Sequence, residues 1–127
     1  MTLEQQVTSV EISKKLKELE VKQESLFWWV EFKSFPVKYW QIVDEDDKKH
    51  LNFPERTISA FTVAELLELL PASTSVLKRT DFPTNKIPRY YAEVFDTHYV
   101  EIYDKNPANA CAKLLIHLLE NKLITLK

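Results

Sequence analysis

The sequence predicts a single α+β domain spanning residues 1–127, in which an antiparallel sheet of about four strands packs against three helices. Two observations support this fold class. Three segments combine a helix-capping signal with apolar residues at helical spacing, and four segments are rich in aromatic and β-branched residues. The predicted element order is α-β-β-α-β-β-α, and no linker-like segment divides the chain.

The first predicted helix covers residues 9–19. Thr8 and Glu11 have the spacing of a capping box, in which each side chain binds the other residue's backbone N–H group. The apolar residues that recur along one face are Ile12, Leu16 and Leu19. The pattern is typical of an amphipathic helix whose apolar stripe faces the core.

Two strands and a polar loop are predicted next. Residues 26–32 and 37–43 are aromatic and β-branched, and Pro36 separates them, so we expect an antiparallel pair. Residues 44–57 contain the densest acidic cluster of the chain. Its spacing does not match a calcium-binding loop, and we interpret the segment as a solvated loop.

A second capping box precedes the second predicted helix. Thr62 and Glu65 form it, and Pro71 ends the helix. The residues expected on the buried face are Val63, Leu66, Leu67 and Leu70. Residues 72–88 contain two prolines and are left without an assigned structure.

Residues 90–95 and 98–103 predict two further strands joined by Asp96 and Thr97. In the second strand, His98, Val100 and Ile102 fall on one face, and Tyr99, Glu101 and Tyr103 fall on the other. This alternation predicts a sheet that is covered on one side.

The last helix has the clearest start signal. Asn106 is placed to cap it, and Pro107 takes the first helical position, where a missing N–H group costs nothing. The wide apolar face comprises Cys111, Leu114, Leu115, Leu118, Leu119 and Leu123.

The chain contains no glycine. Phosphate-binding P-loops, dinucleotide-binding turns and nucleophile elbows all need glycine, so these sites are excluded. Backbone positions with positive φ must fall to other residues. Asn52, Asn85 and Asn121 are the expected ones, because asparagine tolerates the left-handed region best.

No catalytic or metal-binding arrangement is visible in the sequence. His50, His98 and His117 lack the spacing of a metal motif. Cys111 is the single cysteine, and His117 lies about 240° further around the helix, so it cannot activate the thiol. We therefore expect no enzymatic activity, no metal and no cofactor, and we interpret Cys111 as a buried, inert thiol.

Charge and composition bear on partners and location. The chain has 17 basic and 19 acidic residues, a net charge of −2 that disfavours nucleic-acid binding. The single cysteine suits a reducing compartment, and no signal peptide or membrane-length apolar run is visible. We expect a cytoplasmic protein that does not contact the membrane.

The first predicted strand pair is unusually aromatic. Its candidate interface residues are Phe27, Trp28, Trp29, Tyr39 and Trp40. Ordinary core packing with cover from residues 72–88 would explain them, and so would a protein interface or a surface that binds nucleic acid or a small molecule. The interface hypothesis requires Trp28 or Trp29 to be exposed in one chain.

Three blocks resemble a family of short uncharacterised proteins carried by bacterial phages and prophages, including those of gut Bacteroidetes. They are VTSVEISKKLKELEVKQESLFWWV at 7–30, ISAFTVAELLELLP at 58–71 and NPANACAKLLIHLLENKLI at 106–124. This chain departs from the family at Glu20 and Lys122, where glycine is expected. The resemblance implies a phage or mobile-element context in a bacterial cytoplasm, and no activity.

The functional prediction is a non-enzymatic protein-interaction module that binds a partner protein or a second copy of itself. One alternative is a nucleic-acid-associated phage protein. The other is an enzyme whose site assembles from distant segments, for which Asp96, His98 and Glu101 would have to converge in a pocket.

Overall fold

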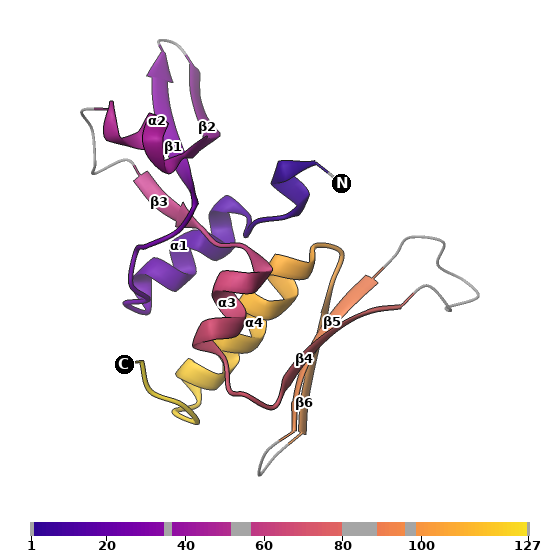
Figure 1. Cartoon of the computed structure of the whole chain (residues 1–127). Helices are drawn as coiled ribbons and strands as arrows, with labels where there is room; N and C mark the ends of the chain where they lie inside the picture. The colour runs from indigo at the N-terminus through magenta and orange to yellow at the C-terminus, as the bar shows by residue number, and fades with distance from the viewer. Residues whose placement is uncertain (1, 35–36, 52–56, 80–88, 96–98, 127) are drawn as a thin grey trace.

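The computed structural model describes residues 2–34, 37–51, 57–79, 89–95 and 99–126 (Figure 1). The helices are η1 (Leu3–Gln5, a short 3-10 helix), α1 (Val10–Glu18), α2 (Glu45–Lys49), α3 (Val63–Leu69) and α4 (Pro107–Glu120). The strands are β1 (Phe27–Ser34), β2 (Val37–Asp44), β3 (Thr57–Ala60), β4 (Thr74–Arg79), β5 (Arg89–Phe95) and β6 (Tyr99–Asp104).

The fold is α+β, as the sequence predicts, and its strands form two separate antiparallel sheets instead of one. The strand orders are β2-β1-β3 and β4-β5-β6. In Figure 1 the first sheet lies at the top with α1 beneath it, and the second lies at the lower right beside α4. The extra strands are β3 and β4, which fall in segments that the sequence leaves as a loop or unassigned.

Helix α4 forms the centre of the larger core. It packs against β5 and β6 on one side and against α1 and α3 on the others. The core residues that it contributes include Cys111, Leu114, Leu115 and Leu118, all buried as the sequence predicts. Leu123, which the sequence also places on this face, is exposed because it lies beyond the end of the helix.

Helix α1 begins one residue later than the predicted capping box requires. Its cap is Ser9, whose side chain accepts a hydrogen bond from the backbone N–H of Ile12. The predicted box of Thr8 and Glu11 is therefore wrong. Thr8 is fully buried, and its hydroxyl instead accepts a hydrogen bond from the backbone N–H of Phe61.

The predicted start of α3 is confirmed. Thr62 and Glu65 form a reciprocal capping box, and the helix ends before Pro71. Leu66 and Leu70 are buried as expected, whereas the predicted burial of Leu67 is wrong, because its side chain remains 38% exposed.

The acidic segment forms a short helix where the sequence predicts a loop. Asp44 caps α2 by accepting a hydrogen bond from the backbone N–H of Asp47. Acidic residues occupy the first turn of α2, and Lys48 and Lys49 occupy its last turn, so both ends suit the helix dipole.

Two charged residues take the left-handed conformation that the sequence assigns to asparagine. Glu20 has φ 66° and Lys122 has φ 56°, whereas Asn121 has φ −92° and is not left-handed. Asn52 and Asn85 lie outside the described residues. Glu20 and Lys122 are also the two positions where the family resemblance leads us to expect glycine.

Both residues close a helix in the same way. After α1, the N–H of Glu20 bonds the carbonyl of Lys17, and the N–H of Val21 bonds the carbonyl of Leu16. After α4, the N–H groups of residues 122 and 123 make the equivalent bonds to residues 119 and 118. These paired bonds define Schellman motifs, in which the left-handed position favours glycine because it has no Cβ.

Glycine at either position should therefore stabilise the protein. We expect Glu20→Gly and Lys122→Gly each to raise the free energy of unfolding by about 0.5–1 kcal/mol, because each relieves left-handed strain. Urea denaturation measures the change. The matched control, Glu18→Gly in a right-handed position of α1, should instead lose about 0.5–1 kcal/mol. Destabilisation by all three substitutions would contradict the explanation.

Candidate interaction surface

The predicted aromatic interface does not present its tryptophans to solvent. Trp28 is 5% exposed and Trp29 is 8% exposed within the single chain. The interface hypothesis required at least one of them to be exposed, so neither supports it.

Helix α2 covers Trp28. The indole N–H of Trp28 donates a hydrogen bond to the carboxylate of Glu45, and Lys48 Nζ lies 3.6 Å from the centre of a Trp28 ring. This distance is typical of a cation–π contact. The contacts of the Trp28 side chain with Glu45 and Lys48 thus come from α2, whereas the sequence predicts cover from residues 72–88, of which 80–88 lie outside the described residues.

Trp29 faces the opposite side of the first sheet. Its indole N–H donates a hydrogen bond of 2.7 Å to the backbone carbonyl of Thr8, and its ring belongs to a small core with Val7 and Ala60. Phe27 and Trp40 are half-buried against this core. The strand is therefore apolar on both faces because each face meets a different segment of the same chain.

Tyr39 is the one exposed member of the five predicted interface residues, with 46% of its surface accessible. Its ring stacks on Phe32 at a centroid distance of 5.5 Å. Of the predicted set, the hairpin therefore exposes one tyrosine to solvent.

A larger exposed aromatic surface lies on the second sheet. The inner face of this sheet packs on α4 through Ala92, Val94, Val100 and Ile102. Residues of the opposite face alternate with these along the strands, and we call this the outer face. By strand register its members are Ser75, Leu77, Arg79, Arg89, Tyr91, Glu93, Phe95, Tyr99, Glu101 and Tyr103.

The strand register arranges the outer face in three rows beyond the pair Arg79 and Arg89, which lies at one end of the sheet. Leu77, Tyr91 and Tyr103 are cross-strand partners in the first row. Ser75, Glu93 and Glu101 form the second row, and Phe95 pairs with Tyr99 in the third. A row of carboxylates thus lies between two rows of large apolar or aromatic side chains.

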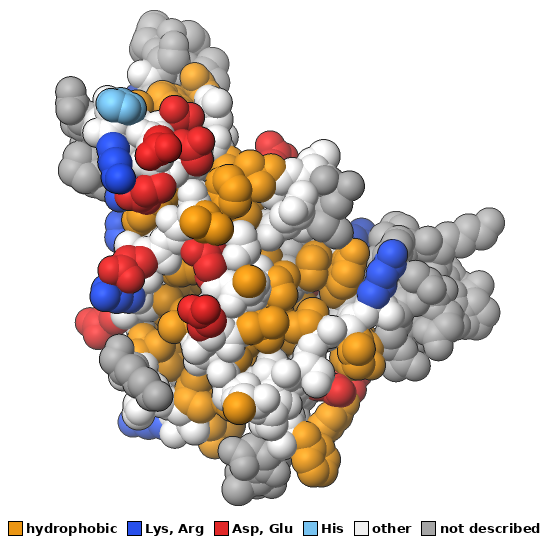
Figure 2. Space-filling model, in the orientation of Figure 1, with side chains coloured by type: hydrophobic (Ala, Val, Ile, Leu, Met, Phe, Trp, Pro, Cys, Tyr) orange, Lys and Arg blue, Asp and Glu red, His pale blue; other side chains and the backbone are white. Residues whose placement is uncertain are grey.

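The apolar rows are open to solvent. Phe95 is 73% exposed, Tyr99 52%, Leu77 45% and Tyr103 37%. Figure 2 shows hydrophobic and acidic side chains side by side at the lower end of the sheet formed by β4, β5 and β6. Monomeric proteins rarely expose several large apolar side chains contiguously, and such patches mark interaction sites.

Tyr99 links the two carboxylates of the middle row. Its hydroxyl is within hydrogen-bonding distance of Glu101 and lies 2.7 Å from Glu93 Oε2. Hydrogen bonding to Glu101, and then to Glu93, raises the pKa of the Tyr99 phenol well above its usual value. The phenol therefore stays protonated at neutral pH and acts as a hydrogen-bond donor.

The sequence contains part of the signal for this surface. Its alternation correctly separates Tyr99, Glu101 and Tyr103 from the inner residues Val100 and Ile102. It does not show that β4 and β5 extend the same face, because strand pairing across the unassigned segment 72–88 is a tertiary property.

The cysteine shows no sign of reactivity. Cys111 is fully buried, and desolvation raises the pKa of its thiol to about 11. A thiol with that pKa is protonated at neutral pH and is a poor nucleophile.

Potential metal ligands do not gather in the part of the chain that the structure describes. No group of three or more His, Cys, Asp or Glu residues there is arranged to hold a metal ion. His98 and Asp96, which the enzyme alternative would need, lie outside the described residues.

An open, mainly apolar pocket of about 290 Å³ lies where β1, α3 and the start of α4 meet. Its lining includes Leu3, Phe27, Val63 and Pro107. None of its lining side chains is ionisable, so the pocket offers no acid–base or nucleophilic chemistry.

Comparison of the chain with protein-family models, curated proteins and solved structures finds no match. Among the described helices, none has the length and apolar run needed to cross a bilayer. The functional argument therefore depends on the geometry of the chain itself, and within that geometry the outer face is the strongest candidate.

Proposed function

We propose that this protein is a non-enzymatic protein-interaction module and that its docking surface is the outer face of the second sheet. The observation that carries the proposal is the exposure of Leu77, Phe95, Tyr99 and Tyr103 on one face, in two rows on either side of the acidic pair. Tyrosine and phenylalanine are enriched in protein interfaces, where they bury large areas at low entropic cost.

The charge on this surface supports a protein partner over a nucleic acid. The acidic residues Glu93 and Glu101 lie at the centre of the outer face and would repel a phosphate backbone seated there, whereas the basic positions Arg79 and Arg89 lie at one end of the face. The net charge of −2 also disfavours a nucleic-acid partner. The phage context and the bacterial cytoplasm remain predictions from the family resemblance.

A peptide-display selection tests the proposal. Random peptides would be selected on the immobilised wild-type protein, and the affinities of the selected peptides would be measured by isothermal titration calorimetry. The test variant combines Leu77→Ser, Phe95→Ser and Tyr103→Ser, all on exposed side chains. We expect it to weaken binding by at least roughly tenfold, because the apolar anchors supply most of the binding energy.

The matched control is Tyr39→Ser, which removes an exposed aromatic side chain from the other sheet. Circular dichroism would verify that both variants are folded. Peptides that bind the triple variant as well as they bind the wild type would refute the outer face as the docking surface, and so would a selection that yields no specific peptide.

A further inference from the structure

Two carboxylates face each other at the centre of the outer face. Glu93 on β5 and Glu101 on β6 are direct cross-strand partners, so their side chains project from neighbouring positions of one face. Like charges directly opposite each other in an antiparallel pair destabilise a sheet. The pair is therefore costly for the isolated chain.

Tyr99 only partly compensates for this repulsion. Its hydroxyl lies within hydrogen-bonding distance of both carboxylates, but a phenol has a single proton to donate. At any moment one carboxylate receives the hydrogen bond, and the other faces an oxygen lone pair. The three groups thus hold two negative charges with one bridging proton.

Among the side chains that the structure describes, none makes an ion pair with Glu93 or Glu101, and the basic positions Arg79 and Arg89 of the same face lie two register rows away. The ion pairs recorded there involve other acidic residues, namely Asp104, Glu24, Glu31 and Glu120. Glu93 and Glu101 are both half-buried, so an approaching cation would meet partly desolvated carboxylates, to which binding is stronger than in open water.

Aromatic rings lie on both sides of the acidic pair. The ring centroids of Tyr91 and Tyr103 are 5.5 Å apart on one side of the pair. Those of Phe95 and Tyr99 are 6.0 Å apart on the other side. Guanidinium and ammonium groups bind both to carboxylates and to aromatic faces. The flanking rows would in turn receive apolar side chains of the ligand.

We propose that the outer face binds a partner-protein segment that places one arginine or lysine between two apolar side chains, with the cation seated on Glu93 and Glu101. This inference rests on the proposed function and names the chemistry of the partner. A second copy of the chain packed with its two-fold axis through the middle row would bring the two acidic pairs together, which disfavours that packing.

The peptides selected in the display experiment provide the probe. We expect them to share a basic residue flanked by apolar ones. Replacing that residue with citrulline, or with norleucine where it is lysine, should weaken binding roughly tenfold. The combined variant Glu93→Gln, Glu101→Gln should weaken binding of the parent peptide by a similar factor, and added salt should weaken it further.

The matched control is Glu18→Gln with Glu68→Gln, which changes the net charge equally at exposed positions away from the outer face. It should leave the affinity unchanged. The Glu93→Gln, Glu101→Gln variant should be at least as stable as the wild type, since it removes a repulsion. Loss of binding therefore cannot be attributed to unfolding.

The other outcomes separate this inference from the proposed function. Peptides that lack a basic residue, yet need Leu77, Phe95 and Tyr103, would overturn the inference and leave the docking surface standing. Peptides that ignore the outer face altogether would overturn both. A concentration-dependent dimer in light scattering that the Leu77, Phe95 and Tyr103 substitutions abolish would show that the occupant is a second copy, and would also overturn the inference.

Discussion

Replacing Thr8 with Val should lower the free energy of unfolding by about 1–3 kcal/mol, because the substitution leaves the buried backbone N–H of Phe61 without its acceptor. The Thr8 hydroxyl accepts a hydrogen bond of 3.1 Å from the backbone N–H of Phe61 and lies 2.7 Å from Ser13 Oγ. Thr8, Ser13 and Phe61 are all buried, so water cannot replace the lost bonds. Urea denaturation measures the effect.

Two further substitutions isolate the contribution of the hydroxyl. Thr8→Ser keeps the oxygen and loses one methyl group, so we expect it to cost only about 1 kcal/mol. Thr125→Val makes the same chemical change as Thr8→Val at an exposed residue and should shift stability by less than about 0.5 kcal/mol. A Thr8→Val protein as stable as the Thr125→Val protein would show that the buried hydroxyl contributes nothing.

Thr8 also shows why the sequence misplaced the first helix cap. Thr8 and Ser9 are both good cap residues, and a glutamate follows Thr8 at the capping-box spacing. The choice of Ser9 depends on Phe61, whose backbone binds Thr8 from 53 residues away. Local spacing contains no information about that contact. At Thr62 and Glu65 the same rule was correct, because the distant N–H of Leu26 bonds the second carboxylate oxygen of Glu65 and leaves the first free for the box.

The missed elements have different causes. All four residues of β3, Thr57–Ala60, are buried, so the strand lacks the alternation that identifies a half-covered strand. By contrast, α2 has a readable signal. Asp44 stands at the cap, acidic residues follow it and two lysines close the helix, but the density of charge favoured a loop interpretation.

The interface predicted from the sequence and the one proposed from the structure lie on different sheets for a related reason. Aromatic density along the chain pointed to the first hairpin, where Trp28 and Trp29 are covered by α2 and by the segment before α1. The outer face is less conspicuous, because its residues alternate with core residues and come from three strands. The sequence shows how many aromatic residues a segment contains. The solvent exposure of those residues depends on which other segments of the chain pack over them in the fold.

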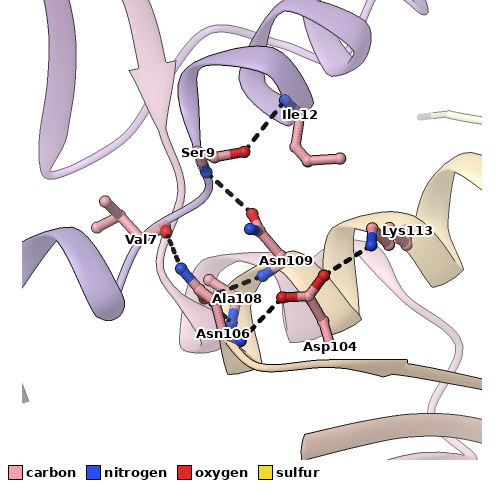
Figure 3. A network of polar contacts seen from close by, with 8 residues as sticks. All are labelled: Val7, Ser9, Ile12, Asp104, Asn106, Ala108, Asn109 and Lys113. Carbon is pink, nitrogen blue, oxygen red and sulfur yellow. Dashed lines mark hydrogen bonds and ion pairs between the residues drawn. The ribbon is translucent and has the colours of Figure 1, made fainter.

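Asn106 should be the other position at which a single polar substitution has a large effect. Its side-chain oxygen accepts hydrogen bonds from the backbone N–H groups of Ala108, at 2.8 Å, and Asn109, at 3.1 Å. Its side-chain amide donates to the carbonyl of Val7 at 2.8 Å. Figure 3 shows that Asn106 thereby connects the start of α4 to the segment before α1.

Two substitutions separate these roles. Asn106→Ala removes both and should cost about 2–3 kcal/mol. Asn106→Asp keeps the oxygen that caps the helix, and its charge suits the helix N-terminus, but it cannot donate to Val7 and lies near the Asp104 carboxylate. We expect it to cost about 1 kcal/mol.

Urea denaturation of the two variants gives the order of stability, and Asn121→Ala, at an exposed cap at the other end of α4, is the control. The control should change stability by about 0.5 kcal/mol or less. If Asn106→Asp is as destabilising as Asn106→Ala, the bond to Val7 dominates and the cap contributes little. If Asn106→Asp matches the wild type, the bond to Val7 contributes nothing, and the attachment of the N-terminal segment depends on its other contacts, among them the hydrogen bond of 2.9 Å from the Ser9 N–H to Asn109.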